Sequence, residues 1–231
     1  MTAVKPSTYP APRRRARPAS AGEPADLEAR SDAEVVAAVL AGVDGPERVL
    51  SWARAALARF DGIDGVLHAT AAELATLPGS ETQGHHGRLQ AARELMLRAL
   101  RERLARGPAL SSPQAVGHFL QAQIARRPHE VFAALFLDAQ HRLLAFEELF
   151  RGTLTQTAVY PREVVKRALA HNAAGVILAH NHPSGTTEPS HADELLTRTL
   201  AEALGIVDVR VVDHVIVARG ACLSFAERGL L

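Results

Sequence analysis

Apolar side chains recur three or four positions apart from Ser31 onward, which is the spacing of one face of a helix. Ser31 and Glu34 can form a capping box at the start of the first helix, and Thr70 with Glu73 can form a second one further along. Glycine and proline residues separate the apolar stripes and mark the helix ends. The pattern therefore predicts a small all-α domain over residues 31–107.

The pattern changes after residue 107, where short apolar runs begin to alternate with amphipathic stretches. Val131–Leu137 is a continuous apolar run, and a polar turn separates it from Leu143–Leu149, which predicts a β-hairpin. Beside the hairpin we expect an amphipathic helix through Val116 and Ile124, a helix from Pro161 to His171, a strand at Gly175–Ala179, a helix at His191–Leu204 and one or two strands within Val207–Val217. Residues 108–231 are thus expected to form an α/β layered domain with a mixed β-sheet flanked by helices.

Residues 1–30 differ in composition from the rest of the chain. They are rich in Pro, Ala, Ser and Arg, and the first twenty carry five basic residues and no acidic one. Such a segment buries too little apolar surface to offset the entropy of ordering, so we expect a disordered basic tail. It could be a solvated leader without a partner, or an arm that contacts nucleic acid or acidic surfaces.

Charge and cysteine content narrow the possible functions. The chain carries 26 basic and 25 acidic residues, and removing the five charges of the tail leaves 21 basic against 25 acidic. This balance lacks the broad positive field of a dedicated nucleic-acid binder. Because Cys222 is the single cysteine, any metal must be held by histidine and carboxylate groups. No apolar stretch is long enough to span a membrane, so we expect a soluble, cytoplasmic protein.

The segment from His180 to Asp193 carries the most informative chemistry, because it joins a predicted strand to a predicted helix. In an extended chain, His180 and His182 project from the same face. Asp193 lies in the first turn of the next helix, where side chains lean back toward the N-terminus, so its carboxylate can face the strand end. Two imidazoles and one carboxylate leave one position open on a tetrahedral ion, as a catalytic zinc requires. Alternatively, Ser190 and Asp193 have the form of a helix cap, which needs no metal.

A family resemblance follows from these residues. The spacing His-x-His, seven residues, Ser, two residues, Asp is similar to the JAMM (MPN+) metalloprotease motif, and His182, Ser190 and Asp193 fit that count. Over roughly residues 111–231 the chain also resembles the bacterial RadC family. The segments that carry this resemblance are Leu137-Asp138, Phe146–Leu149, Gly152–Leu154, Tyr160–Val164, His180–Gly185 and Asp213–Val217.

The resemblance implies a JAMM/MPN-like fold and a zinc-dependent metallopeptidase or isopeptidase that hydrolyses an amide bond in a peptide or protein substrate. A site of this type needs a glutamate at the start of the first strand as general base, and Glu130 occupies that place, with Glu147 and Glu148 as rivals on the second strand. Ser190 would donate a hydrogen bond to the developing oxyanion. The sequence leaves open whether Ser190 does so or caps its helix.

A second function remains possible, because the helical region resembles the helix-hairpin-helix segment of RadC proteins, which contacts DNA through backbone N–H groups. Here the segment Gly79–Gly87 is longer than the usual Gly-hydrophobic-Gly turn, contains an acid and has no lysine. The alternative is a DNA-repair-associated accessory protein, in which the helical domain or the tail contacts nucleic acid weakly and the metal is structural or regulatory. A nuclease that uses the same metal is a third possibility.

The remaining candidate side chains are expected to have structural roles. His171 lies at a helix end, where it interacts favourably with the helix dipole. Asp213 and His214 are expected to form a hydrogen-bonded pair at a strand end, and Cys222 to be a small core residue. His191 has no assigned role.

Overall fold

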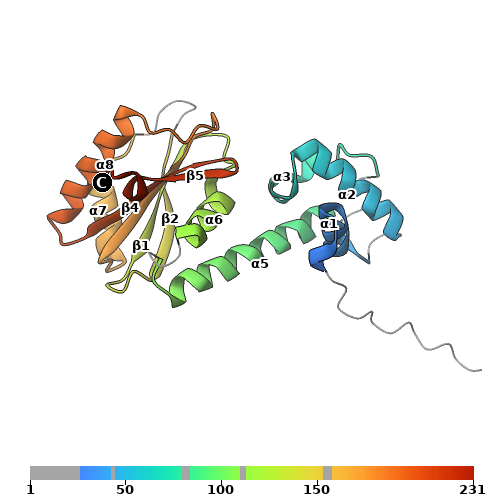
Figure 1. Ribbon diagram of the computed structural model, residues 1–231, viewed down its shortest axis with the longest axis horizontal. Helices are drawn as coiled ribbons and strands as arrows, with labels where there is room; N and C mark the ends of the chain where they lie inside the picture. The colour runs from blue at the N-terminus through green and yellow to red at the C-terminus, as the bar shows by residue number, and fades with distance from the viewer. Residues whose placement is uncertain (1–26, 43–44, 80–83, 110–112, 153–157) are drawn as a thin grey trace, which may run out of the picture.

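The computed structural model describes two regions joined by the long helix α5 (His85–Arg106) (Figure 1). The described residues are 27–42, 45–79, 84–109, 113–152 and 158–231. Three of the segments discussed above lie outside these ranges. They are most of the expected basic tail, residues 80–83 in the middle of the Gly79–Gly87 segment, and Thr153 and Leu154 of the family resemblance. The expectations for those segments therefore stay predictions.

The first region is helical, as the apolar spacing predicts. Its elements are a short 3-10 turn (Leu27–Ala29), α1 (Asp32–Leu40), α2 (Pro46–Phe60), α3 (Ile63–His68), α4 (Ala71–Leu74) and α5. Both predicted capping boxes are present: the backbone N–H of Ser31 donates to the Glu34 carboxylate at 2.8 Å, and that of Thr70 donates to Glu73 at 2.8 Å. The helical region thus begins its helices where the sequence indicates.

Helix α3 is an addition to the predicted elements. It follows a left-handed turn at Asp61, where φ is 58°. Gly65 allows α3 to approach the end of α2 closely, because a Cβ at this position would lie 1.6 Å from the carbonyl oxygen of Phe60. With six residues, α3 is too short to show a helical period in its sequence.

Helix α5 belongs to both regions. Near its start, Leu89 packs in the core of the helical region beside Trp52. Near its end, Leu104 packs with α6 (Pro113–Ile124) and the sheet. The side chain of Arg93 adds a polar connection, since it donates to the backbone carbonyl of Ala122 at 2.7 Å. The proposed boundary at residue 107 stays a prediction, because one helix contributes to both cores.

The second region is a five-stranded mixed sheet with helices on both faces, which confirms the predicted fold class. Its elements after α6 are β1 (Val131–Leu137), β2 (Leu143–Arg151), α7 (Pro161–Ala170), β3 (Gly175–Asn181), α8 (His191–Gly205), β4 (Arg210–Ala218), β5 (Ala221–Ser224) and α9 (Phe225–Arg228). The strand order is β2-β1-β3-β4-β5. The only parallel pair among the described strands is β3 with β4, and the other neighbours are antiparallel.

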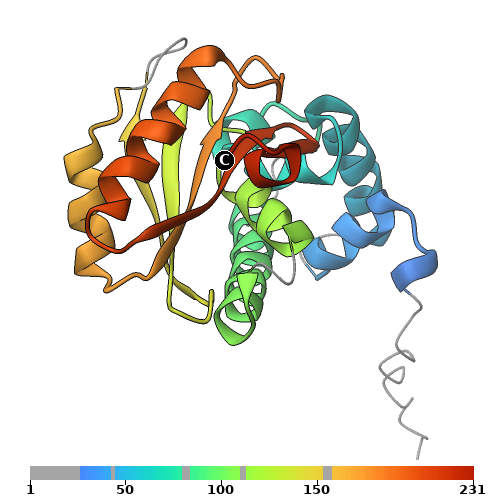
Figure 2. The same ribbon diagram turned by 60° about the vertical axis from the view of Figure 1, so that its left-hand side comes forward.

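The two faces of the sheet are covered by different helices (Figure 2). Helices α7 and α8 pack on the face that includes Phe132 and Leu178, whereas α6 packs on the face that includes Leu135 and Ile177. Because side chains alternate along a strand, His180 lies on the α7 and α8 face, two residues after Leu178. Among the described residues, none of the helices has the length and apolar character needed to cross a lipid bilayer.

Candidate metal centre

The central strand β3 positions the two predicted histidine ligands. It runs two residues further than the sequence predicts, to Asn181, and all seven of its residues are buried. His180 pairs with Phe132 of β1 and with Ile216 of β4, and it is 1% exposed. The backbone N–H of His182, just past the strand end, still donates to the carbonyl oxygen of Val217 at 3.0 Å. Hydrogen bonds to β4 therefore fix the backbone that carries both imidazoles.

Helix α8 positions the predicted carboxylate ligand. Ser190 is its N-cap, and the Asp193 backbone N–H donates to the Ser190 hydroxyl at 3.2 Å. In return, the backbone N–H and the hydroxyl of Ser190 donate to Oδ2 of Asp193, at 2.7 and 2.6 Å. This capping box fixes the carboxylate of Asp193 against the start of α8. Ser190 therefore caps the helix in this structure, which is one of the two roles that the sequence leaves open.

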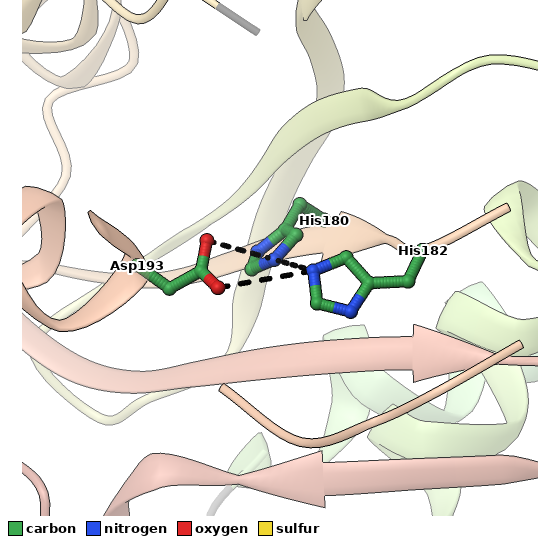
Figure 3. Close-up of side chains that lie close together, drawn as sticks. All are labelled: His180, His182 and Asp193. Atoms are coloured by element: carbon green, nitrogen blue, oxygen red, sulfur yellow. Dashed lines mark hydrogen bonds and ion pairs between the residues drawn. The ribbon is translucent and has the colours of Figure 1, made fainter. Parts of the chain in front are cut away.

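The three predicted ligands lie close together between the end of β3 and the start of α8 (Figure 3). Nε2 of His180 lies 2.9 Å from Nε2 of His182 and 3.3 Å from Oδ1 of Asp193. Nε2 of His182 lies 3.8 Å from Oδ2 of Asp193. One atom from each of the three residues could therefore contact the same small ion.

The hydrogen bonds of His182 test whether this donor set suits a cation. Its Nδ1 lies 3.0 Å from the carbonyl oxygen of Thr186. A carbonyl oxygen can only accept, so Nδ1 carries the proton and Nε2 of the neutral ring presents its lone pair. That lone pair faces the Asp193 carboxylate, an arrangement that a cation between them would stabilise. Two imidazoles and a carboxylate suit Zn²⁺, which takes nitrogen and oxygen ligands.

Burial keeps His180 in the form that binds metals. The loss of solvent lowers the pKa of His180 to about 4, the negative charge of Asp193 raises it, and His182 lowers it further. Since this value lies well below neutral pH, the imidazole is uncharged at pH 7 in the absence of a metal. Metal binding then requires no deprotonation of His180.

Behind His180 lies a buried residue to which the sequence alone gave only a structural role. Nε2 of His214, on β4, lies 2.8 Å from Nδ1 of His180, and Nδ1 of His214 lies 2.6 Å from the hydroxyl of Thr197 on α8. The sequence predicted a hydrogen-bonded pair of Asp213 and His214, and the two residues are hydrogen-bonded: the backbone N–H of His214 donates to the carboxylate of Asp213 at 2.7 Å. The ring of His214 does not take part in this pair, because its two nitrogens contact His180 and Thr197.

The predicted general base, Glu130, lies next to the first residue of β1. Pairing of Phe132 with His180 in antiparallel register places Glu130 opposite His182 when the register is continued by two residues. Alternation along the strand puts the Glu130 side chain on the same face as Phe132. Glu130 is half-buried, and its carbonyl oxygen accepts a hydrogen bond from the Gly152 N–H at 2.9 Å.

Asn181 holds the backbone on both sides of Glu130. Its side-chain oxygen accepts from the Val131 N–H at 2.8 Å, and its side-chain NH₂ donates to the carbonyl oxygens of His129 and Arg127 at 3.2 and 3.4 Å. Asn181 is fully buried. Asn181, between the two histidines, therefore directs its side chain toward residues 127–131 and fixes the segment that carries the predicted base.

We expect the substitution Asn181→Ala to destabilise the fold, because it leaves the buried N–H of Val131 without its acceptor. An unsatisfied buried donor costs about 1–3 kcal/mol, so urea denaturation should show a free energy of unfolding lower by roughly 2 kcal/mol. Surface substitutions usually change this quantity by less than about 0.5 kcal/mol. A change that small for Asn181→Ala would show that these hydrogen bonds contribute little.

The rival glutamates and the lone cysteine lie in other surroundings. Glu147 accepts hydrogen bonds from Arg167 and lies within hydrogen-bond distance of His171. These two partners lower the pKa of Glu147 to about 2, although burial acts in the opposite direction. Glu148 pairs with Arg127. His171 thus has a carboxylate partner in addition to its place at the helix end. Cys222 is exposed, so the prediction of a core residue is wrong. Loss of solvent around its sulfur still raises the pKa of the thiol to about 11, which disfavours the reactive thiolate.

Comparisons with known proteins agree on one family. The sequence model of the RadC-like JAB domain matches residues 110–230, a stretch that includes all the residues of the candidate metal centre. A UPF0758 protein of Methylibium petroleiphilum is 56% identical over 220 residues, which cover 90% of this chain and 98% of the relative. A UPF0758 protein of Leptothrix cholodnii is 57% identical over 204 residues, with 88% and 91% covered. One of Nitrosospira multiformis is 54% identical over 202 residues, with 87% and 89% covered.

Proposed function

The chain belongs to the RadC family and contains its JAB domain, and from this premise we propose that it is a zinc-dependent hydrolase that cleaves an amide bond, as a metallopeptidase or isopeptidase does. JAB domains belong to a superfamily of metalloproteases. The observation that carries the proposal is the convergence of His180, His182 and Asp193. Three ligands of this kind leave a coordination position open, which distinguishes catalytic zinc sites from structural ones.

The ion and the protein would divide the chemistry between them. When bound, zinc supplies a Lewis acid that lowers the pKa of a water molecule and polarises a substrate carbonyl. Glu130 would accept a proton from the attacking water and pass it to the nitrogen of the leaving amine. Hydrolysis then adds the remaining hydroxyl to the carbonyl carbon as the carbon–nitrogen bond breaks.

The surroundings of the site support these roles in different ways. Asn181 holds the backbone next to Glu130, and the ring of Phe132 stacks on His180 at 6.4 Å between centroids. Ser190 orients the ligand carboxylate of Asp193 through its hydroxyl. A bond from Ser190 to a developing oxyanion, as the family resemblance implies, requires this hydroxyl to turn away from Asp193. We propose a peptide or protein as the substrate.

The proposal is tested by metal analysis and by an activity assay on the full chain. After expression in zinc-supplemented medium, we expect about one zinc per chain, as a single three-ligand site holds. Hydrolysis of a peptide and isopeptide library, followed by mass spectrometry, should stop on treatment with a chelator and resume on addition of zinc. Zinc-free protein from metal-replete cells, or cleavage that is insensitive to chelation, would contradict the proposal.

A further inference from the structure

We propose that Thr197 and His214 are positioning residues that fix the tautomer of His180, so that the lone pair of its Nε2 faces the metal position. The two residues link α8 and β4 to the end of β3 through an unbroken series of hydrogen bonds. The inference rests on the proposed function for what the lone pair binds. The direction of the hydrogen bonds follows from the contacts themselves.

The direction is set at the Thr197 hydroxyl, which has two close neighbours. Its oxygen lies 2.6 Å from the backbone carbonyl oxygen of Asp193 and 2.6 Å from Nδ1 of His214. The carbonyl has no proton to give, so the single hydroxyl proton of Thr197 must be donated to it. The second short contact is then a hydrogen bond only if Nδ1 of His214 donates its own proton to the Thr197 oxygen.

The same reasoning passes through the ring of His214. A neutral imidazole that carries its proton on Nδ1 has an acceptor lone pair on Nε2. That Nε2 lies 2.8 Å from Nδ1 of His180, which must therefore be the donor. With its proton on Nδ1, neutral His180 presents the lone pair of Nε2 to His182 and Asp193. The hydrogen bonds thus select the tautomer that can bind a metal through Nε2.

The environment of His214 protects this arrangement from water. His214 and Thr197 are 0% and 1% exposed, so neither can exchange its partner for solvent. The ring of His214 packs between Phe225, at 4.8 Å, and Phe132, at 5.8 Å between centroids. An alternative tautomer of His214 would leave two buried acceptors facing each other at 2.6 Å, which is costly in an apolar surrounding. The assigned tautomers bring the lone pairs of Nε2 of His180 and Nε2 of His182 to 2.9 Å, a contact that a cation between them relieves.

The chain of hydrogen bonds also connects two of the predicted ligands to each other. It begins at the side chain of His180 and ends at the backbone carbonyl of Asp193, one turn before Thr197 on α8. Metal-bound histidines usually donate their other ring N–H to a carboxylate, a carbonyl or a water. Here the neutral imidazole of His214 accepts that bond and donates to the Thr197 hydroxyl, which in turn donates to the Asp193 carbonyl. No further negative charge is therefore placed behind the site.

The test combines one variant with two matched controls. Thr197→Val keeps the shape of the side chain and removes the hydroxyl, whereas Thr197→Ser keeps the hydroxyl. Thr199→Val makes the same change at an exposed position of the same helix. The Thr199 hydroxyl that it removes donates to the carbonyl of Leu195 at 2.9 Å. The first measurement is the zinc dissociation constant of the full chain, by competition with a chromophoric chelator. The second is the protonation of the ring nitrogens in metal-free protein, by histidine ¹⁵N NMR with signals assigned from single histidine substitutions.

We expect Thr197→Val to weaken zinc binding about 10- to 100-fold, the usual effect of removing a partner of a ligand, with both controls close to wild type. In metal-free wild-type protein, His180 and His214 should carry their protons on Nδ1. Zinc affinity unchanged in Thr197→Val, or a proton on Nε2 of His180 in the wild type, would overturn the inference. The NMR measurement needs no bound metal and is made on the wild-type chain rather than on the Thr197 variants, so it decides the inference even if the proposed function fails.

Discussion

The substitution His182→Ala is expected to abolish zinc binding, and Asp193→Ala is expected to do the same. Each removes one of three ligands, and the two that remain cannot hold the ion in a tetrahedral arrangement. Loss of a residue that only supports a ligand weakens metal binding by about 10- to 100-fold, so loss of a ligand itself should exceed that. Elemental analysis of the purified full chain should therefore find zinc in the wild type and almost none in either variant.

The two variants should differ in stability, which separates the metal site from the helix cap. Asp193→Ala also removes the acceptor for the backbone N–H and hydroxyl of Ser190, so α8 loses the reciprocal half of its capping box, while the backbone N–H of residue 193 still donates to the Ser190 hydroxyl. A hydrogen bond of this kind contributes about 0.5–1.5 kcal/mol. His182→Ala leaves the cap intact, so in metal-free protein it should be the more stable of the two. His191→Ala is the matched control, because His191 is an exposed histidine at the start of the same helix. Zinc retained by His182→Ala, or lost from His191→Ala, would contradict the proposed ligands.

The ligand group could be predicted from the sequence because its geometry is local. His180 and His182 share a face through the two-residue period of a strand, and Asp193 reaches back from the first turn of the next helix. A single connection of eight residues, from 183 to 190, joins the two parts. The family resemblance, confirmed by the comparisons, came from the same segment together with motifs spread over the second half of the chain.

His214 and Thr197 could not be assigned in this way, because their partners are distant in the sequence. His214 is 34 residues from His180 and reaches it only through the parallel pairing of β3 with β4. Nothing in a sequence period specifies which strands become neighbours across a helical crossover. A weak local signal did exist, since Thr197 lies four residues after Asp193 on the same helix face.

The sequence also did not predict three short elements, because their positions depend on contacts with distant parts of the chain. Helix α3, strand β5 and helix α9 have six, four and four residues. Such lengths hold little more than one period of a helix or two of a strand, so no apolar pattern can establish them. Their positions depend on tertiary packing, as in the contact of Phe225 with Ile216 and Leu223 in one small core cluster.

The substitution Glu130→Gln is expected to remove hydrolysis while leaving zinc bound. The amide keeps the size of the side chain and loses the ability to accept a proton from water at neutral pH. General acid–base catalysis by a positioned side chain contributes about 10²- to 10⁴-fold, so the rate on any substrate found for the wild type should fall by that factor. The zinc content should stay at the wild-type value, because His180, His182 and Asp193 are unchanged.

Glu147→Gln and Glu148→Gln are the controls for Glu130→Gln, because they make the same chemical change one strand away. Glu147 pairs with Arg167 and Glu148 with Arg127, so each already has a cationic partner. Their substitution should lower stability slightly, as exposed ion pairs are worth about 0–1 kcal/mol, and should leave the rate near that of the wild type. A rate that falls with Glu148→Gln and survives Glu130→Gln would move the general base to β2. That result would also contradict the register argument, in which continued pairing of β1 with β3 brings Glu130 beside His182.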